Sequence, residues 1–181
     1  MKRALALLFI AAALPLLAGC GEAEDPVPER PSPTPEATAN RAAGARSVID
    51  MTGRPVQLDE EIRTVAAMSP AAAEFAAALG LEVVGRSSDT PETVAPGARP
   101  TGSTISPDFN AIAALAPDLV LADAAYHAGR TRDFDRFAYP VYVLKANSYA
   151  EVLAALTALG EATGRAEAAA SARAAIAARA E

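Results

Sequence analysis

Residues 106–122 read Ser-Pro-Asp-Phe-Asn-Ala-Ile-Ala-Ala-Leu-Ala-Pro-Asp-Leu-Val-Leu-Ala, which predicts a helix, a stop and a buried strand in succession. Ser106 suits an N-cap, and Pro107 would then occupy the first helical position. Apolar residues recur at helical spacing until Pro117, and residues 119–121 form an unbroken apolar run. Because a strand that is apolar on both faces belongs in a parallel sheet covered by helices, we expect binding groups after the carboxyl ends of such strands.

The composition fits one domain of ordinary size. Of the 181 residues, 51% are hydrophobic but only 5% are aromatic. Much of the apolar fraction is alanine, which buries little surface, so the core depends on a modest number of Leu, Val, Ile and Phe side chains. The net charge of −6 and the lack of a basic stripe argue against a nucleic-acid partner.

The first residues predict an export signal rather than part of the fold. Lys2 and Arg3 precede an apolar stretch, residues 4–17, that is short for a membrane span. The stretch closes with Leu-Ala-Gly-Cys, which resembles a bacterial lipobox and implies a signal peptide over 1–19 and lipid attachment at Cys20. The alternative is an ordinary signal peptide with a chance cysteine. Since the chain has one cysteine, an internal disulfide is excluded.

Residues 20–46 are rich in Pro, Glu, Ala and Thr and cannot bury a core. They predict a disordered tether behind the lipidated cysteine, which would hold a domain about 30 Å from the lipid. A tether of this kind suits a domain that must reach a membrane partner.

The folded lobe is expected over 47–164, as an α/β, doubly wound parallel sheet of the Rossmann-like type with an amino-terminal hairpin. Gly53 supplies the hairpin turn, and Ser148 with Glu151 forms a capping box that opens a helix ending at Gly164. The segments are a hairpin of 47–50 and 55–58, strands 64–68, 81–85, 119–122 and 141–144, and helices 69–80, 106–116, 130–137 and 148–164.

Residues 165–181 predict one further alanine-rich helix with a single large apolar side chain, Ile176. Such a helix has little surface to bury and carries charges on several faces. We infer that something that should pack on this helix is missing.

Several short motifs, in this order and spacing, resemble the substrate-binding lipoproteins of ABC importers for iron-siderophores, cobalamin and haem. The likeness covers 47–181. The motifs are Asp50-x-x-Gly53-Arg54-x-Val56, Arg63 to Pro70 with Glu74, Ala78-Leu79-Gly80, Val83-Val84-Gly85, the Ser106 to Leu121 segment and Thr163-Gly164-Arg165.

The resemblance implies two α/β lobes joined by a long helix, with the ligand in the cleft between them. This sequence corresponds to the leader, the tether, the amino-terminal lobe and, in 165–181, the start of the connecting helix, with the second lobe absent. The implied function is capture of a metal chelate and its delivery to an ABC permease and its ATPase. The protein would be lipid-anchored and extracytoplasmic in the cell envelope, without a cofactor. If half of the cleft is missing, ligand affinity is expected to be weak.

Residues at two helix starts and one polar loop are candidates for ligand binding. Ser69-Pro70 and Ser106 begin helices at strand ends, where free backbone N–H groups attract oxygen atoms. The alternative is that both serines are structural caps. Arg86 and Ser87 follow another strand, and Arg86 suits a carboxylate or phosphate; the alternative for Arg86 is a solvated surface charge.

Tyr126 and His127 follow the third strand in an expected loop. A tyrosine here resembles the ligand contact of hydroxamate-siderophore binders, although it could merely shield the helix below. His127 could ligate haem iron, donate a hydrogen bond or do neither. Thr104 is also a candidate, but residues 102–105 lack the arginine, tyrosine or tryptophan that such families use, which leaves the ligand open.

Permease docking in this family uses a glutamate in the helix after Ser106. Asn110 stands there in this chain, so docking by that salt bridge is in doubt, although Asp108 could substitute.

Catalysis is not predicted. The chain has no Gly-rich phosphate loop, Cys-His pair, His cluster or G-x-S-x-G motif, and no metal site is expected. The alternative to transport is a truncated single-lobe lipoprotein with a structural or interaction role.

Overall fold

The computed structural model describes residues 45–134 and 137–180. The predicted signal peptide, the lipidation at Cys20 and nearly all of the tether lie outside the described residues. The strands are β1 (Arg46–Ile49), β2 (Pro55–Leu58), β3 (Thr64–Ala67), β4 (Glu82–Arg86), β5 (Arg99–Pro100), β6 (Leu119–Asp123) and β7 (Val141–Leu144). The helices are α2 (Pro70–Ala78), α3 (Phe109–Ala114), α4 (Ala124–His127), the 3-10 turn η1 (Ala128–Arg130), α5 (Thr131–Phe134), α6 (Tyr149–Thr163) and α7 (Ala166–Ala177).

A five-stranded parallel sheet in the order β5-β4-β3-β6-β7 forms the centre of the lobe. The four predicted strands are confirmed, and so is the α/β doubly wound class. The sequence did not predict β5, which contributes two residues paired with Gly85 and Arg86. A two-residue strand is too short to show an alternation of apolar and polar residues, so no sequence pattern predicts it.

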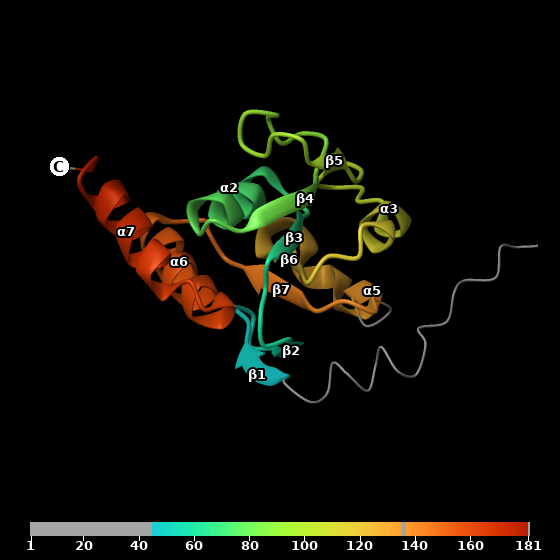
Figure 1. Ribbon diagram of the computed structural model, residues 1–181, viewed down its shortest axis with the longest axis horizontal. Coiled ribbons are helices and arrows are strands. Elements are labelled where there is room, and N and C mark those ends of the chain that lie inside the picture. The colour runs from blue at the N-terminus through green and yellow to red at the C-terminus, as the bar shows by residue number, and fades with distance from the viewer. Residues whose placement is uncertain (1–44, 135–136, 181) are drawn as a thin grey trace, which may run out of the picture. The chain divides into compact units, whose positions relative to one another are not determined.

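Successive residues of the central strands supply two separate cores, because side chains in a strand alternate between its faces. Val65 and Ala67 of β3 pack in the cluster formed with α2, α6 and α7. Ala66 and Met68 pack in the other cluster, with Ile112 of α3. Figure 1 shows α2, α6 and α7 on one side of the strands and α3 and α5 on the other. Both faces of the sheet are therefore covered, which explains the unbroken apolar runs.

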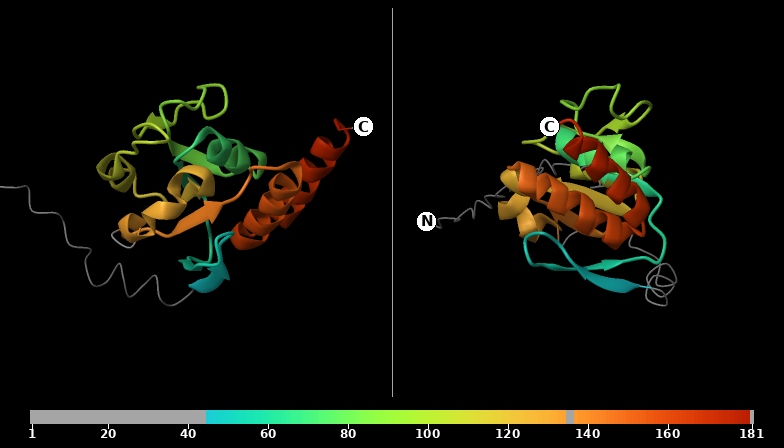
Figure 2. Two further views of the ribbon diagram at one scale, coloured as in Figure 1. Left: turned by 180° about the vertical axis from the view of Figure 1, so that it is seen from behind. Right: turned by 90° about the vertical axis from the view of Figure 1, so that its left-hand side faces the viewer.

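The hairpin of β1 and β2 is antiparallel, as predicted, and Figure 2 shows it at one end of the lobe, apart from the sheet. Its turn is held by the buried Asp50, whose Oδ1 accepts hydrogen bonds from the backbone N–H groups of Thr52 and Arg54 at 2.8 and 3.0 Å. The N–H of Met51 donates to the carbonyl of Val143 in β7 at 3.2 Å. The hairpin turn therefore covers part of the outer edge of β7.

The predicted start of α3 is wrong. Its N-cap is Asp108, whose Oδ1 accepts from the N–H groups of Asn110 and Ala111, both at 3.0 Å. Ser106 lies two residues earlier in a tight turn with Ser103, and Pro107 forms an isolated bridge with Gly102. Both Ser106 and Asp108 are good caps by type, and the helix begins at the later one because residues 103–107 are used by the turn and the bridge.

The expected loop after the third strand is also wrong. Asp123 ends β6 and caps α4 at once, so Tyr126 and His127 lie on a helix that continues through η1 into α5. The predicted helix of 130–137 corresponds to α5, whereas α4 and the turn η1 before it were not predicted. In contrast, α6 is as predicted, with Ser148 accepting from the N–H of Glu151 and Gly164 ending the helix in a left-handed conformation.

The alanine-rich α7 packs against α6 more closely than its composition suggests. Figures 1 and 2 show the two helices side by side. Ala169 is buried, and a Cβ built on Gly160 of α6 would lie 2.5 Å from the Cβ of Ala169. Small side chains thus bring two helices together. Among the residues of α7 only Ala169 is buried, so the expectation that a further packing partner of this helix is missing stays a prediction. Among the helices of the described residues, none is long and apolar enough to cross a bilayer.

Candidate functional site

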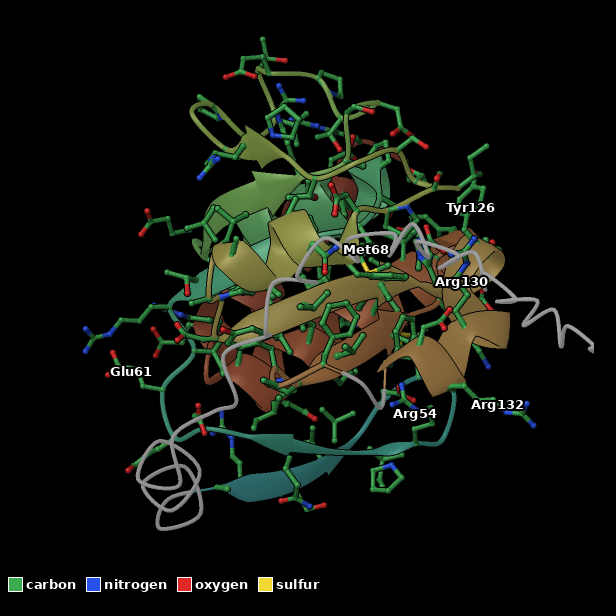
Figure 3. The ribbon with its side chains drawn as sticks, turned by 90° about the vertical axis from the view of Figure 1, so that its right-hand side faces the viewer. Arg54, Glu61, Met68, Tyr126, Arg130 and Arg132 are labelled. Atoms are coloured by element: carbon green, nitrogen blue, oxygen red, sulfur yellow. The ribbon has the colours of Figure 1, made fainter. Side chains whose placement is uncertain are left out.

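The strand order reverses between β3 and β6, because the chain runs from β3 outward to β4 and β5 and then returns to the other side of β3. In open parallel sheets a ligand crevice forms at the carboxyl ends of the strands at such a reversal. Ser69 lies two residues after the end of β3, and Asp123 is the last residue of β6. Figure 3 shows Tyr126 and Arg130 on the side of the molecule opposite Glu61, which precedes β3, so the two edges of the sheet are distinct.

Ser69 and Asp123 lie in contact at the reversal. The hydroxyl of Ser69 caps α2 by accepting from the N–H of Ala72 at 3.1 Å, and it donates to Oδ2 of Asp123 at 3.3 Å. The other oxygen of Asp123 accepts from the N–H of Ala125 at 2.9 Å and caps α4. Both side chains are buried, so the hydroxyl of Ser69 is a structural cap, and Pro70 beside it is half-buried.

His127 has no exposed surface, and both of its ring nitrogens are hydrogen bonded. Nδ1 accepts from the backbone N–H of Asp123 at 3.0 Å, and Nε2 lies 2.8 Å from the carbonyl oxygen of Thr104. Burial lowers the pKa of this imidazole, and the neighbouring Arg130 adds to that effect. As placed here, the histidine offers neither nitrogen to a haem iron or to any other ligand.

Thr104 is held by Asp89 from the loop after β4. Its N–H and its hydroxyl donate to the two carboxylate oxygens at 3.0 and 2.5 Å. Burial opposes ionisation of Asp89, but hydrogen bonds from Thr104, from its own backbone N–H and from Ser87 together lower the pKa of Asp89. The side chain of Thr104 is therefore buried and fully engaged inside the lobe.

Arg86 and Ser87 also serve the loop that follows β4. The Arg86 side chain is only 12% exposed, donates to the carbonyl of Thr90 at 2.8 Å and pairs with Glu92. The Ser87 hydroxyl lies 2.7 Å from that of Thr90 and is buried. In this arrangement both terminal nitrogens of the guanidinium are engaged within the loop of residues 87–97.

The side chains that face outward at this edge are fewer. Tyr126 is 55% exposed and Ile105 is 71% exposed. Ser106 is exposed and lies in a turn with Ser103. These groups can contribute an aromatic face, an apolar side chain and hydroxyl groups, which suits binding by shape and a few polar contacts.

Of the predicted contacts, Ser69, His127 and Thr104 are linked through Asp123 by hydrogen bonds, and the Tyr126 ring lies beside that of His127. Ser106 lies on the loop next to Thr104, while Arg86 and Ser87 belong to the adjoining loop after β4. Sequence reasoning missed Arg130, whose guanidinium donates to the carbonyl of Ile105 at 3.0 Å. If the sequence analysis had begun a helix at Ala124, it would have placed Arg130 on the same helical face as Tyr126, because the two residues are four apart.

The predicted docking residues lie at the start of α3. Asp108 and Asn110 are both exposed, but one carboxylate oxygen of Asp108 caps the helix. Within residues 45–134 and 137–180, no three His, Cys, Asp or Glu side chains are grouped so as to hold a metal ion. Two surface pockets, one beside β2 and one beside β4, include none of the eight predicted ligand contacts.

The lobe is similar to several proteins of known sequence or structure. The Fe(3+) dicitrate-binding periplasmic protein FecB of Escherichia coli (strain K12) is 41% identical over 66 residues, which are 35% of this chain and 22% of that protein. Staphylococcus aureus SirA complexed with staphyloferrin B aligns with a TM-score of 0.59 at 17% identity, over 70% of this chain and 44% of that one. The siderophore-binding protein BauB, bound to two acinetobactin molecules and ferric iron, aligns with a TM-score of 0.62 at 19% identity, over 73% of this chain and 50% of that one.

The chain therefore spans at most half of the length of these relatives. At such identities the two solved structures show a shared fold. The model of one family, described as periplasmic binding protein, matches residues 65–181, from β3 through α7. With most of the described lobe matched in this way, the chain belongs to the periplasmic binding protein family.

Proposed function

We propose that this lobe binds a ferric chelate, such as an iron-siderophore or ferric citrate, as part of the substrate-binding component of an ABC importer. Binding requires no reaction and no cofactor, since the chelate itself carries the metal. In this proposal the protein is extracytoplasmic, held in the cell envelope by a lipid at Cys20, and delivers its ligand to a permease with its ATPase.

Family membership and the named relatives support the class of ligand. FecB is named for binding ferric dicitrate, and BauB carries a ferric siderophore complex. Cobalamin and haem remain members of the same ligand class for this chain. A ferric chelate is favoured over haem by one observation in this lobe: His127, its single histidine, is buried with both nitrogens engaged.

The observation that carries the proposal is the exposed Tyr126 beside the reversal of strand order between β3 and β6. A phenol ring can lie against an apolar or conjugated part of a chelate and donate a hydrogen bond from its hydroxyl. Ile105 and Ser106 are exposed on the loop of residues 103–106, which Arg130 contacts through the carbonyl of Ile105. We also propose that Asp108 and Asn110 on α3 face the permease, since both are exposed.

The test is a calorimetric titration of the chain with ferric citrate, a ferric hydroxamate siderophore, cyanocobalamin and haemin. We expect binding of a ferric chelate, and Tyr126→Ala should weaken it about tenfold, as is common for an exposed aromatic anchor.

Tyr149→Ala is the matched control, because Tyr149 is exposed to a similar extent, 51%, but follows β7. We expect it to change the affinity less than about twofold. If both variants lost affinity equally, the binding site would extend toward the end of β7. A chain that binds none of the four compounds would contradict the proposal.

A further inference from the structure

The ring of His127 joins two segments that are distant in sequence. Its Nδ1 accepts from a backbone N–H and therefore carries no proton, which leaves the proton on Nε2 to donate to the carbonyl of Thr104. The first bond is local, to Asp123 at the start of α4. The second reaches 23 residues back along the chain to the loop that carries Ser106.

We propose that His127 is a positioning residue that fixes the loop of residues 103–106 against α4 and so sets the spacing between Ser106 and Tyr126 on the binding surface. This inference rests on the proposed function for its consequence, but the contact itself is a property of the ligand-free lobe. Tyr126 is adjacent in sequence, and its ring centroid lies 6.2 Å from that of His127. A shift of the imidazole would therefore move both walls of the surface.

The loop is closed at its base by the bridge of Gly102 and Pro107 and by the hydrogen bond from the N–H of Asp108 to the carbonyl of Thr101 at 2.8 Å, but its tip has few other anchors. Ile105 and Ser106 are exposed, and the hydrogen bonds between Ser103 and Ser106 lie within the loop itself. What ties the loop to the rest of the lobe is the buried Thr104, through Asp89 on one side and His127 on the other, with Arg130 reaching Ile105 near the surface. The bond to His127 is shielded from water, whereas that of Arg130 is exposed, so His127 makes the stronger link between the loop and α4.

Protonation of His127 would break this arrangement. A second proton would have to sit on Nδ1, which faces the N–H of Asp123, so two donors would oppose each other. The charged groups around the ring are the Asp123 carboxylate at the end of β6, Arg130 on η1 and Asp89, which binds Thr104. Arg130 and burial both disfavour the imidazolium, while Asp123 favours it, and burial is the largest influence on the pKa.

Two substitutions separate the two bonds. His127→Gln places an amide N–H donor at the distance of Nε2 and can keep the bond to Thr104. His127→Asn places a carbonyl oxygen at the distance of Nδ1 and can keep only the local bond to Asp123. Thr163→Val is the matched control, because it removes a buried side-chain hydrogen bond, to the carbonyl of Leu159 at 2.7 Å, at the far end of α6.

The readout is amide hydrogen exchange of residues 103–106 in the ligand-free chain, followed by NMR, with the 15N shifts of the ring reporting the tautomer. In His127→Asn we expect exchange at least about tenfold faster at these amides, since one buried hydrogen bond is lost. His127→Gln and Thr163→Val should stay within about threefold of the parent chain. In the parent chain, protection of the loop should fall as the ring becomes protonated, and in His127→Gln this dependence on pH should vanish.

Equal exchange in the Asn and Gln variants, or ring shifts that place the single proton on Nδ1, would overturn the proposal. Affinity for ferric citrate is the second measurement, and it should fall about tenfold in His127→Asn but not in Thr163→Val. If the parent chain does not bind ferric citrate, the proposed ligand is refuted, while the exchange data still decide the role of His127.

Discussion

Gly102→Ala should destabilise the loop of the candidate site, residues 103–106, by more than the cost of its left-handed backbone conformation alone. Gly102 has a φ of +85°, and its Cβ would lie 2.5 Å from both the backbone nitrogen of Asp108 and the carbonyl oxygen of Ser106. All of these atoms belong to backbone, so no flexible side chain can move aside. The bridge between Gly102 and Pro107 would have to open.

Two costs contribute, and the chain offers a control that separates them. An alanine in the left-handed region costs about 1–2 kcal/mol, and forced overlap in packed surroundings costs about 1–3 kcal/mol more. Gly97 has a φ of +77° in the same region of the chain, but nothing lies within 4 Å of its Cβ position. Gly97→Ala should therefore show only the first cost, whereas Gly102→Ala should lose about 2–5 kcal/mol of unfolding free energy.

Urea unfolding followed by circular dichroism measures both variants. If the slope of the transition is unchanged, the difference between the two midpoints gives the steric contribution. Hydrogen exchange at residues 103–106 should also accelerate in Gly102→Ala and not in Gly97→Ala. Equal midpoints would mean that the segment 102–108 does not pack as described, and the reasoning about this loop would be refuted.

Three further results are expected. Gly160→Ala should destabilise the fold by about 1–3 kcal/mol in urea unfolding, and adding Ala169→Gly should restore most of the loss, because the two positions share one contact. Asp118→Ala should cost about 1.5–3 kcal/mol, since one carboxylate oxygen accepts from both the N–H and the hydroxyl of Thr64 at 2.8 and 3.0 Å. The pKa of His127 is lowered in the fold, so the unfolded chain takes up the proton first as the pH falls. The contribution of His127 to the unfolding free energy is therefore complete above about pH 6.5 and is lost as the pH falls toward the folded-state pKa. Unfolding midpoints measured from pH 8 to 5 should show this decline in the parent chain and a smaller one in His127→Gln.

The parts of the fold that could be predicted from sequence are those where one physical requirement dominates. Apolar runs such as 119–121 have no alternative to burial between two helical layers, and β6 and β7 are buried at every residue. Gly164 could be predicted as a helix end because the left-handed conformation that closes α6 favours glycine. The close approach of α6 and α7 at Gly160 could not be predicted, because glycine is needed there only to make room for the side chain of Ala169 on another helix.

At the candidate site, two features could not be predicted from sequence for another reason. Ser106 and Asp108 have similar capping ability, and a bridge to Gly102 decides between them. His127 is polar and follows a strand, which suggested a ligand contact, yet it is buried because Thr104 brings a carbonyl oxygen to it. In both cases the contact that decides the structure is made by another segment, Gly102 for the helix start and Thr104 for His127, and residue spacing does not show that these segments lie close together.

The polar groups at the carboxyl edge form one continuous chain of hydrogen bonds, from Ser69 through Asp123 and His127 to Thr104 and Asp89. Burying such groups is unfavourable unless each finds a partner, so a substitution at any one of them leaves its neighbour unsatisfied. The proposed ligand surface can therefore change at outward side chains such as Tyr126 without disturbing the fold, whereas the buried hydrogen-bonded groups beneath it cannot be substituted one at a time. This division predicts that variants of altered ligand preference will arise at the exposed positions and that changes in the buried chain will affect stability and loop order together.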